Sequence, residues 1–163
     1  EALARTTTKQ IRHMLFTLRP LVLETRGLAA AVEQYVEKLT EASDLPISFA
    51  AEPGCDAALA RGAQGAIFYI IEEAISNARK HARADIIWVR LFVDAQGSFI
   101  AEIEDDGRGF EEDAVRTTYD QSGSLGLVNM EERAEMAGGK VTIATAPGAG
   151  TRVRVAVPLE KRS

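Results

Sequence analysis

The chain has 163 residues, of which 46% are hydrophobic and 26% are charged, and its formal net charge is −5. These values are typical of one globular domain and exclude a disordered chain. The negative charge argues against broad nucleic-acid binding, which needs a basic surface to neutralise phosphates. The longest apolar run, Ala66–Ile71, is far shorter than the roughly 20 residues that span a bilayer. The single cysteine, Cys55, cannot form an internal disulfide, so we expect a cytoplasmic domain without membrane contact.

Apolar residues at helical spacing predict two helices in the N-terminal third. In residues 11–18 they recur at i, i+3, i+4 and i+7, and this helix should end before Pro20. A second apolar stripe runs from Leu28 to about Ser43. The short apolar segment Ile47–Ala51 then predicts a strand.

The middle of the chain predicts a long helix and a hairpin. The most strongly patterned helix covers about residues 59–82, and the β-branched and aromatic segment 85–93 follows it as a buried strand. A turn-forming "DAQG" separates this strand from its partner at 98–104. A later helix at 127–137 should stop at the glycine pair 138–139.

Two final strands, 140–146 and 151–158, flank the turn "PGAG" and predict a hairpin with the valines of its second strand inward and the arginines outward. Residues 110–124 show no period and are predicted to form a mobile loop. The order of elements predicts an α/β (α+β) two-layer sandwich. Its helices should cover one face of a mixed, mostly antiparallel sheet of about five strands.

The long helix carries four polar residues along one edge of its apolar stripe. At about 100° per residue, Glu73, Asn77, Lys80 and His81 fall on one edge beside the apolar positions. An amide oxygen can bind a hard cation, a carboxylate can orient a water, and the two basic groups can meet phosphate oxygens. The alternative is a surface helix with ion pairs at i,i+4 spacing. The residues expected on the solvent side are Glu72, Ser76 and Arg79.

The stretch "IEDDGRGFEE" places acids and glycines directly after a predicted strand. Gly107 and Gly109 remove two side chains, so a planar heterocycle can approach the backbone while Asp105 accepts a hydrogen bond from its amine. The alternatives are a solvated turn and a calcium loop, although the acids lack the alternating spacing of a calcium loop. Arg108 and Glu111 are expected to be exposed to solvent.

Two more glycine sites lie further along the chain. Gly123 and Gly126 are expected to precede a helix whose free N–H groups can bind an anion such as a phosphate. The turn 148–151 adds a hydroxyl, that of Thr151, at the start of a strand. Taken singly, an ordinary helix start explains the first site equally well, and the second by itself is a simple hairpin.

Four segments of the chain resemble, in the same order, four boxes of the catalytic ATP-binding domain of bacterial sensor histidine kinases. The segments are "EEAISNARKHA", "DDGRGF", "GSLGLVNMEERA" and "GAGTRVRVAVP". These are the N box, the two glycine boxes and the terminal Gly-Thr box. The domain belongs to a superfamily shared with DNA gyrase, MutL-type repair proteins and heat-shock chaperone ATPases. The Asn-x-x-Lys-His form is similar to the subfamily of nitrate and membrane-fluidity sensors. The resemblance covers about residues 28–158 and implies a Bergerat-type ATP-binding fold that binds ATP and Mg²⁺.

The resemblance implies a role for each matching position. Asp105 would accept a hydrogen bond from the adenine amine, Asn77 would be the Mg²⁺ ligand, and Glu73 would lie beside a metal-bound water. Glu73 and Asn77 are thus the implied catalytic residues. The other implied nucleotide contacts are Lys80 and His81, Gly107 and Gly109 at the adenine edge, Gly123, Gly126 and Leu127 on the lid side, and Thr151 in support of the base.

The N-terminal segment, residues 13–32, is similar to the junction between the dimerisation and phosphotransfer hairpin and the ATP-binding domain of that subfamily. We therefore expect residues 1–26 to be the C-terminal part of a hairpin helix and its linker. Residues 27–163 would then be the catalytic domain. One departure is Ser124, which stands where the family often has a glycine.

The family's phosphoacceptor histidine has no counterpart, since His13 is followed by Met14 and not by an acidic residue, and His81 belongs to the nucleotide wall. We expect the chain to bind Mg–ATP and to transfer the γ-phosphate to a histidine outside it, for relay to a response regulator, without labelling itself. The parent would be a homodimeric kinase, with this chain as a cytosolic part. The alternatives are a nucleotide-gated interaction module without kinase activity and an anti-sigma-type protein-serine kinase.

Overall fold

The computed structural model describes residues 20–112 and 122–160. Its sheet has five strands in the order β1-β2-β3-β5-β4. β1 runs parallel to β2, and the other neighbouring strands are antiparallel, so the predicted mixed and mostly antiparallel sheet is confirmed. The strands are β1 (Ile47–Ala51), β2 (Ile87–Val93), β3 (Ser98–Asp105), β4 (Lys140–Thr145) and β5 (Thr151–Pro158).

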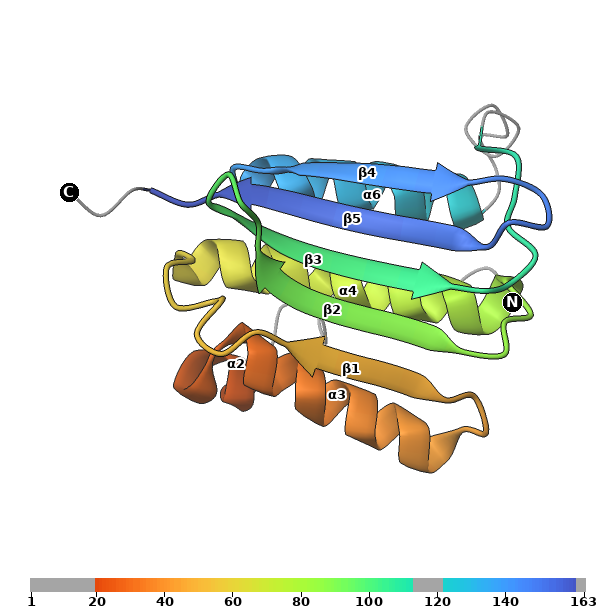
Figure 1. The fold of residues 1–163 in the computed structure, drawn as a ribbon, viewed down its shortest axis with the longest axis horizontal. Helices are drawn as coiled ribbons and strands as arrows, with labels where there is room; N and C mark the ends of the chain where they lie inside the picture. Colours follow the sequence, from red (N-terminus) through yellow and green to blue (C-terminus); the bar gives the residue numbers. More distant parts are fainter. Residues whose placement is uncertain (1–19, 113–121, 161–163) are drawn as a thin grey trace, which may run out of the picture.

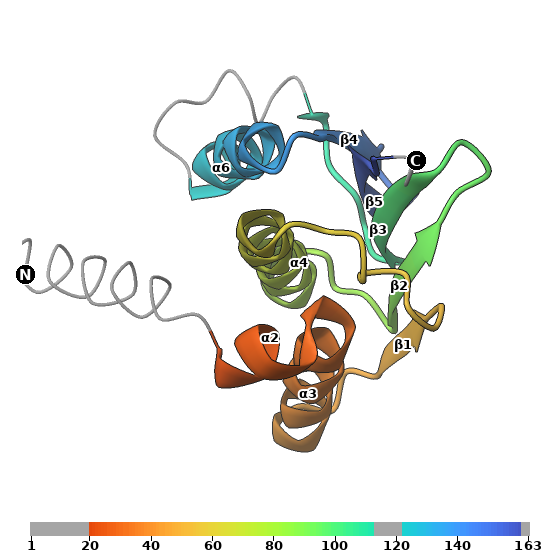
Figure 2. The ribbon, with the colours of Figure 1, turned by 90° about the vertical axis from the view of Figure 1, so that its left-hand side faces the viewer.

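The described helices lie on one face of this sheet, which gives the predicted two-layer sandwich (Figures 1 and 2). They are α2 (Leu21–Arg26), α3 (Leu28–Ala42), α4 (Arg61–His81) and α6 (Ser122–Met136). α4 lies between α3 and α6 and covers the middle of the sheet (Figure 2). No helix in the described part of the chain is long and apolar enough to cross a membrane.

The hydrophobic core lies between α4 and the inner face of the sheet. On β5, Val153, Val155 and Val157 are buried while Arg152 and Arg154 point to the opposite face, as the period of two predicted. Full burial of an isoleucine side chain contributes about 1.5–3 kcal/mol. The fully buried isoleucines of α4 are Ile67, Ile70, Ile71 and Ile75.

The junction before α3 contains a helix that the sequence did not predict. α2 occupies residues that were expected to be a linker, and its Leu23 is buried in the main core. Gly27, with φ of 88°, separates α2 from α3, and a residue with a side chain is strained in that conformation. The predicted helix at 11–18 lies outside the described residues.

α6 begins five residues earlier than predicted. It covers Ser122–Met136, so Gly123 and Gly126 lie inside the helix, and the prediction that they precede it is wrong. The prediction treated glycine as a helix boundary, but here the absence of a side chain at Gly126 lets α6 approach α4 closely. Residues 113–121 of the predicted loop lie outside the described residues, and the helix already occupies 122–124.

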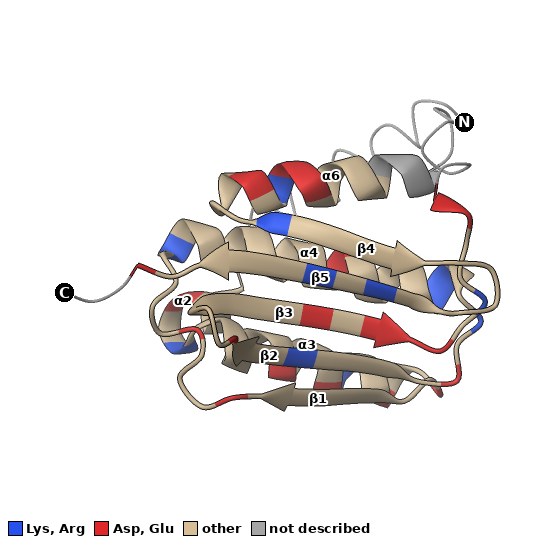
Figure 3. Cartoon of the chain, turned by 45° about the horizontal axis from the view of Figure 1, so that its top comes forward, with Lys and Arg blue, Asp and Glu red and all other residues tan. Residues whose placement is uncertain are grey.

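Charged residues of both signs lie side by side on β2, β3 and β5 (Figure 3), and their side chains form a ladder on the face of the sheet opposite the helices. Glu102 accepts hydrogen bonds from Arg90 on β2 and from Arg154 on β5. Glu104 likewise binds Arg90 and Arg152. Opposite charges on neighbouring strands stabilise a sheet by roughly 0.2–1 kcal/mol per pair, so the ladder stabilises a face that no described helix covers.

Candidate functional site

A cavity of about 280 Å³ opens between α4, α6 and the sheet. Its polar side chains come from the C-terminal half of α4, the end of β3, the loop that follows β3 and the start of β5, and its remaining wall is mostly apolar. The lining residues are Asn77, His81, Asp105, Arg108, Gly109 and Thr151, with Ala74, Ala78, Ala82, Ile103, Phe110, Leu127, Met130, Ile143 and Val153. An apolar cleft with a few convergent polar groups is the usual form of a small-molecule site.

The cavity brings together six of the residues singled out in the sequence, from four separate segments. They are Asn77, His81, Asp105, Gly109, Leu127 and Thr151. The other described candidates, which lie outside the lining, are Glu73, Lys80, Gly107 and Gly126. Gly123 lies in the first turn of α6, where the surroundings of residues 122–125 are not described.

Asp105 is the last residue of β3 and is a buried carboxylate that borders the cavity. Its side chain accepts a hydrogen bond from the Gly107 N–H at 2.9 Å, and 7% of the residue is exposed. Burial raises the pKa of Asp105, while the backbone N–H groups of Gly107 and Thr151 act in the opposite direction. A partly desolvated carboxylate gains most from a ligand that donates a hydrogen bond to it.

The segment after Asp105 is held between the end of α4 and the β4–β5 turn. Arg108 N–H donates to Ala82 O at 2.7 Å, and Gly148 N–H donates to Arg108 O at 2.6 Å. A Cβ on Gly107 would collide with the Ala82 carbonyl, so a glycine is required here by close backbone packing. Gly109 has φ of 61°, which also favours glycine.

Thr145 on β4 orients the hydroxyl of Thr151, and no sequence pattern pointed to this residue. Thr145 Oγ1 accepts a hydrogen bond from Phe110 N–H at 3.1 Å and donates one to Gly150 O at 3.1 Å. It also lies 3.0 Å from Thr151 Oγ1. Because Thr145 has already used its proton, Thr151 is the donor in that last bond, and its oxygen lone pairs remain for a ligand.

Glu73 and Asn77 lie one turn apart on α4, and the backbone of α6 covers both. A Cβ on Gly126 would lie 2.6 Å from Glu73 Oε1 and 3.6 Å from Asn77 Nδ2. Carboxylate and amide oxygens are ligands that Mg²⁺ accepts together with nucleotide phosphates. The chemistry of this pair therefore fits a divalent cation at the edge of the cavity.

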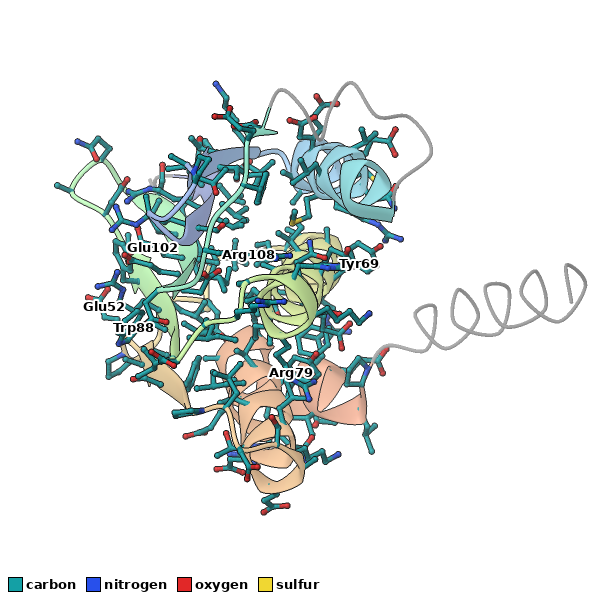
Figure 4. The ribbon with its side chains drawn as sticks, turned by 90° about the vertical axis from the view of Figure 1, so that its right-hand side faces the viewer. Glu52, Tyr69, Arg79, Trp88, Glu102 and Arg108 are labelled. Atoms are coloured by element: carbon teal, nitrogen blue, oxygen red, sulfur yellow. The ribbon has the colours of Figure 1, made fainter. Side chains whose placement is uncertain are left out.

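Arg108 is an additional cation at the cavity. It is exposed to solvent, as predicted, but it also lines the opening between α4 and the sheet (Figure 4). A guanidinium at this place can contact an anionic group of a ligand. The position of Arg108 between Gly107 and Gly109 in the sequence could have indicated that it lies at the site. Lys80, by contrast, is exposed and outside the lining.

The prediction that Glu72 and Ser76 face solvent is wrong, because both are half-buried. Tyr35 on α3 packs edge-on against Phe68 of α4, with ring centroids 5.9 Å apart, and covers this side of the helix. Burial, and then the neighbouring Glu73 charge, raise the pKa of Glu72 to about 7. Arg79 is exposed as predicted.

Solved structures with the same architecture establish the class of fold. The chain superposes on the histidine kinase domain of the blue-light activated kinase EL346 from Erythrobacter litoralis with a TM-score of 0.65, at 22% identity, over 81% of this chain and 61% of that one. It also superposes on the ATP-binding domain of PrrB from Mycobacterium tuberculosis with a TM-score of 0.61, at 22% identity, over 78% and 90% of the two chains. The fold is therefore the Bergerat-type ATP-binding sandwich.

Sequence comparison gives the family. Residues 62–161 match the family described as histidine kinase-, DNA gyrase B-, and HSP90-like ATPase. A sensor-like histidine kinase from Chloroflexus aurantiacus is 41% identical over 98% of this chain and 27% of its own length. The sensor histidine kinase LiaS of Bacillus subtilis is 29% identical over 98% of this chain and 42% of its own. The chain thus spans less than half of these relatives, and it belongs to the histidine kinase-, gyrase B- and HSP90-like ATPase family.

Proposed function

We propose that the chain is the ATP-binding catalytic part of a sensor histidine kinase and that it binds Mg–ATP in the cavity between α4, α6 and the sheet. The observation that carries the proposal is the pair of oriented acceptors at the cavity floor, Asp105 and Thr151, below an apolar wall. The sensor-kinase relatives do not favour the two alternatives, a passive nucleotide-gated module and a protein-serine kinase.

Adenine binds at the floor of the cavity in this proposal. Its exocyclic amine donates to the Asp105 carboxylate, and Thr151 supports the same edge of the base. Apolar side chains from the sheet and from α6, such as Val153 and Met130, contact the faces of the ring. Gly107 and Gly109 allow the segment that forms the adenine edge to pack closely.

The phosphates extend toward the exposed edge of α4. Asn77 and Glu73 hold the divalent ion and an adjacent water, and the ion, when bound, neutralises charge on the triphosphate. Lys80 and His81 lie at the same end of α4 and contact phosphate oxygens. Further contacts come from Gly123, Gly126 and Leu127 of α6, on the side of the cavity next to the start of this helix.

The γ-phosphate is transferred to a histidine on a helical hairpin outside residues 27–163, and a response regulator then receives it. Residues 1–26 are the end of that hairpin and its linker, and the parent kinase is a cytosolic or membrane-anchored homodimer. Because neither histidine of the chain is a suitable acceptor, the chain incubated with radiolabelled ATP should remain unlabelled. A separately purified hairpin that carries the acceptor histidine should gain an acid-labile phosphate. Phosphohistidine on the chain itself would contradict the proposal.

The decisive binding experiment is calorimetry of Mg–ATP with the chain and with Asp105→Asn. A hydrogen bond to a charged group contributes about 1.5–3 kcal/mol, so affinity should fall roughly ten- to hundredfold. The matched control is Asp106→Asn, the same change one residue away. Asp106 accepts from the N–H groups of Asp85 and Ile86 and lies outside the cavity, so affinity should change by less than about twofold. Equal losses in the two variants would refute the assignment.

A further inference from the structure

Helices α4 and α6 contact each other at two separate points along their length. At one point Gly126 of α6 lies against Glu73 and Asn77 of α4. At the other, Arg133 of α6 lies over the ring of Tyr69 on α4. Residue numbers rise along α6 as they fall along α4, so the two helices are antiparallel along this contact.

Tyr69 makes two different polar contacts with α6. The Arg133 guanidinium carbon lies 4.4 Å from the centroid of the Tyr69 ring, within the range of a cation–π interaction. The Tyr69 hydroxyl also forms a side-chain hydrogen bond with Asn129. The three side chains are half-buried, so water competes only partly for these contacts. Figure 4 shows Tyr69 on the side of α4 that faces α6.

The spacing of these residues links the aromatic contact to the metal edge. Tyr69, Glu73 and Asn77 follow one another at i, i+4 and i+8 and therefore share one face of α4. Gly126 and Arg133 are seven residues apart, which is about two helical turns, and share one face of α6. Fixing Arg133 over Tyr69 therefore also fixes where the backbone at Gly126 meets Glu73.

Leu127, Met130 and Ala134 are buried and dock α6 on the core. Apolar packing is not directional, and Gly126 offers only backbone atoms to the flexible Glu73 side chain. A planar guanidinium over a ring, with a hydrogen bond beside it, restricts both sliding and rotation of α6. Catalytic groups need such support from neighbouring side chains to keep a productive geometry.

We propose that Tyr69 is a positioning residue that sets the location of α6 on α4 and thereby the geometry of Glu73 and Asn77 at the phosphate end of the site. This inference rests on the proposed function for its effect on nucleotide binding. Its structural part, the placement of α6, does not depend on any nucleotide.

The test compares Tyr69→Leu, which removes both contacts, with Tyr69→Phe, which keeps the ring beneath Arg133. The matched control is Tyr35→Leu, because Tyr35 packs against α4 from α3, on the side away from α6. The first measurement is amide hydrogen exchange at residues 126–130 of the 163-residue chain without nucleotide. Tyr69→Leu should raise the exchange rates there about tenfold, while Tyr69→Phe and Tyr35→Leu should leave them within about threefold of the parent.

The second measurement is calorimetry with Mg–ATP and with adenosine. Tyr69→Leu should weaken Mg–ATP about tenfold and adenosine by less than about threefold, since Asp105 and Thr151, which receive the edge of the base, lie on the sheet and only one face of the ring contacts Met130 of α6. Tyr69→Phe should recover most of the Mg–ATP affinity.

Three results would overturn the inference: unchanged exchange at 126–130 in Tyr69→Leu, equal losses for both ligands, or the same losses in Tyr35→Leu. If the parent chain binds neither ligand, the proposed function fails, and the exchange measurement still decides whether Tyr69 positions α6.

Discussion

The two sides of α4 each carry an aromatic and an acidic residue, but the surroundings of these residues differ. Toward α6 the helix presents Tyr69, Glu73 and Asn77, and toward α3 it presents Phe68 and Glu72. The first side borders an open cavity, whereas the second is covered by Tyr35 and its neighbours on α3.

The comparison shows that adjacent residues of one helix can serve ligand binding and folding separately. Glu72 and Glu73 are neighbours in sequence, but only the second is near the cavity edge, while burial raises the pKa of the first. Substitutions on the α3 side should therefore change the free energy of unfolding, and substitutions on the cavity side should change nucleotide affinity.

The largest effect on stability is expected from Phe68→Ala on the α3 side. Loss of a buried phenylalanine usually costs about 3–5 kcal/mol, and this ring also packs against Tyr35. Urea unfolding should show the loss, while Mg–ATP affinity of the folded fraction stays within about twofold. Ile143→Ala in the cavity wall is the matched control, and it should lower Mg–ATP affinity more and stability less than Phe68→Ala does. Equal affinity losses in both would erase the distinction between the two sides.

Asn77→Ala tests the cavity side. Removing the amide should weaken Mg–ATP about tenfold or more, because the proposed metal ligand is lost, and should weaken ATP without Mg²⁺ much less. Its control is Ser76→Ala, one residue along the helix and half-buried away from the lining. An identical loss with and without Mg²⁺ would show that Asn77 does not act through the ion.

Glu72→Gln tests the α3 side through pH. The folded-state pKa of Glu72 is about 7, above the ordinary 4.5, so the folded chain favours the neutral carboxyl. This preference contributes to the free energy of unfolding in full below pH 4.5, and the contribution is lost as pH rises through 7. Glutamine stays neutral, so at pH 8 the variant should be more stable by about 1 kcal/mol after allowance for solvent screening. Urea midpoints at pH 4 and pH 8 measure this, and a constant difference would contradict the assigned cause.

The smallest effect is expected from Arg108→Gln at the cavity opening. The side chain is exposed, so its attraction for phosphate is screened, and Mg–ATP affinity should fall only about two- to fivefold. The loss should shrink as salt is added, and adenosine binding should not change. Arg79→Gln, an exposed arginine outside the lining, should alter neither ligand.

Local patterns predicted most of the fold and the polar floor of the site. The period of two placed the valines of β5 inward, and the acidic glycine turn pointed to Asp105, which lines the cavity. These features are encoded in short stretches, where periodicity and turn chemistry apply.

The features that sequence reasoning missed depend on contacts between distant elements. Gly126 lies inside α6, where it meets Glu73 of α4, and Thr145 matters because β4 brings it to Thr151. Glu72 is half-buried close to Tyr35 of α3, which its helical angle alone does not reveal. Packing of this kind overrides local propensity and is set only once the layers assemble.

The charged ladder on the open face of the sheet has a consequence for the base-binding floor on the reverse. Glu104 pairs with Arg152 across β3 and β5, and the next residue pair in the same register is Asp105 with Thr151. The two strands that carry the proposed adenine-binding residues are thus linked on the opposite face by an ion pair that dissolved salt can reach. Added salt should therefore weaken the support behind these two residues without any ion entering the pocket.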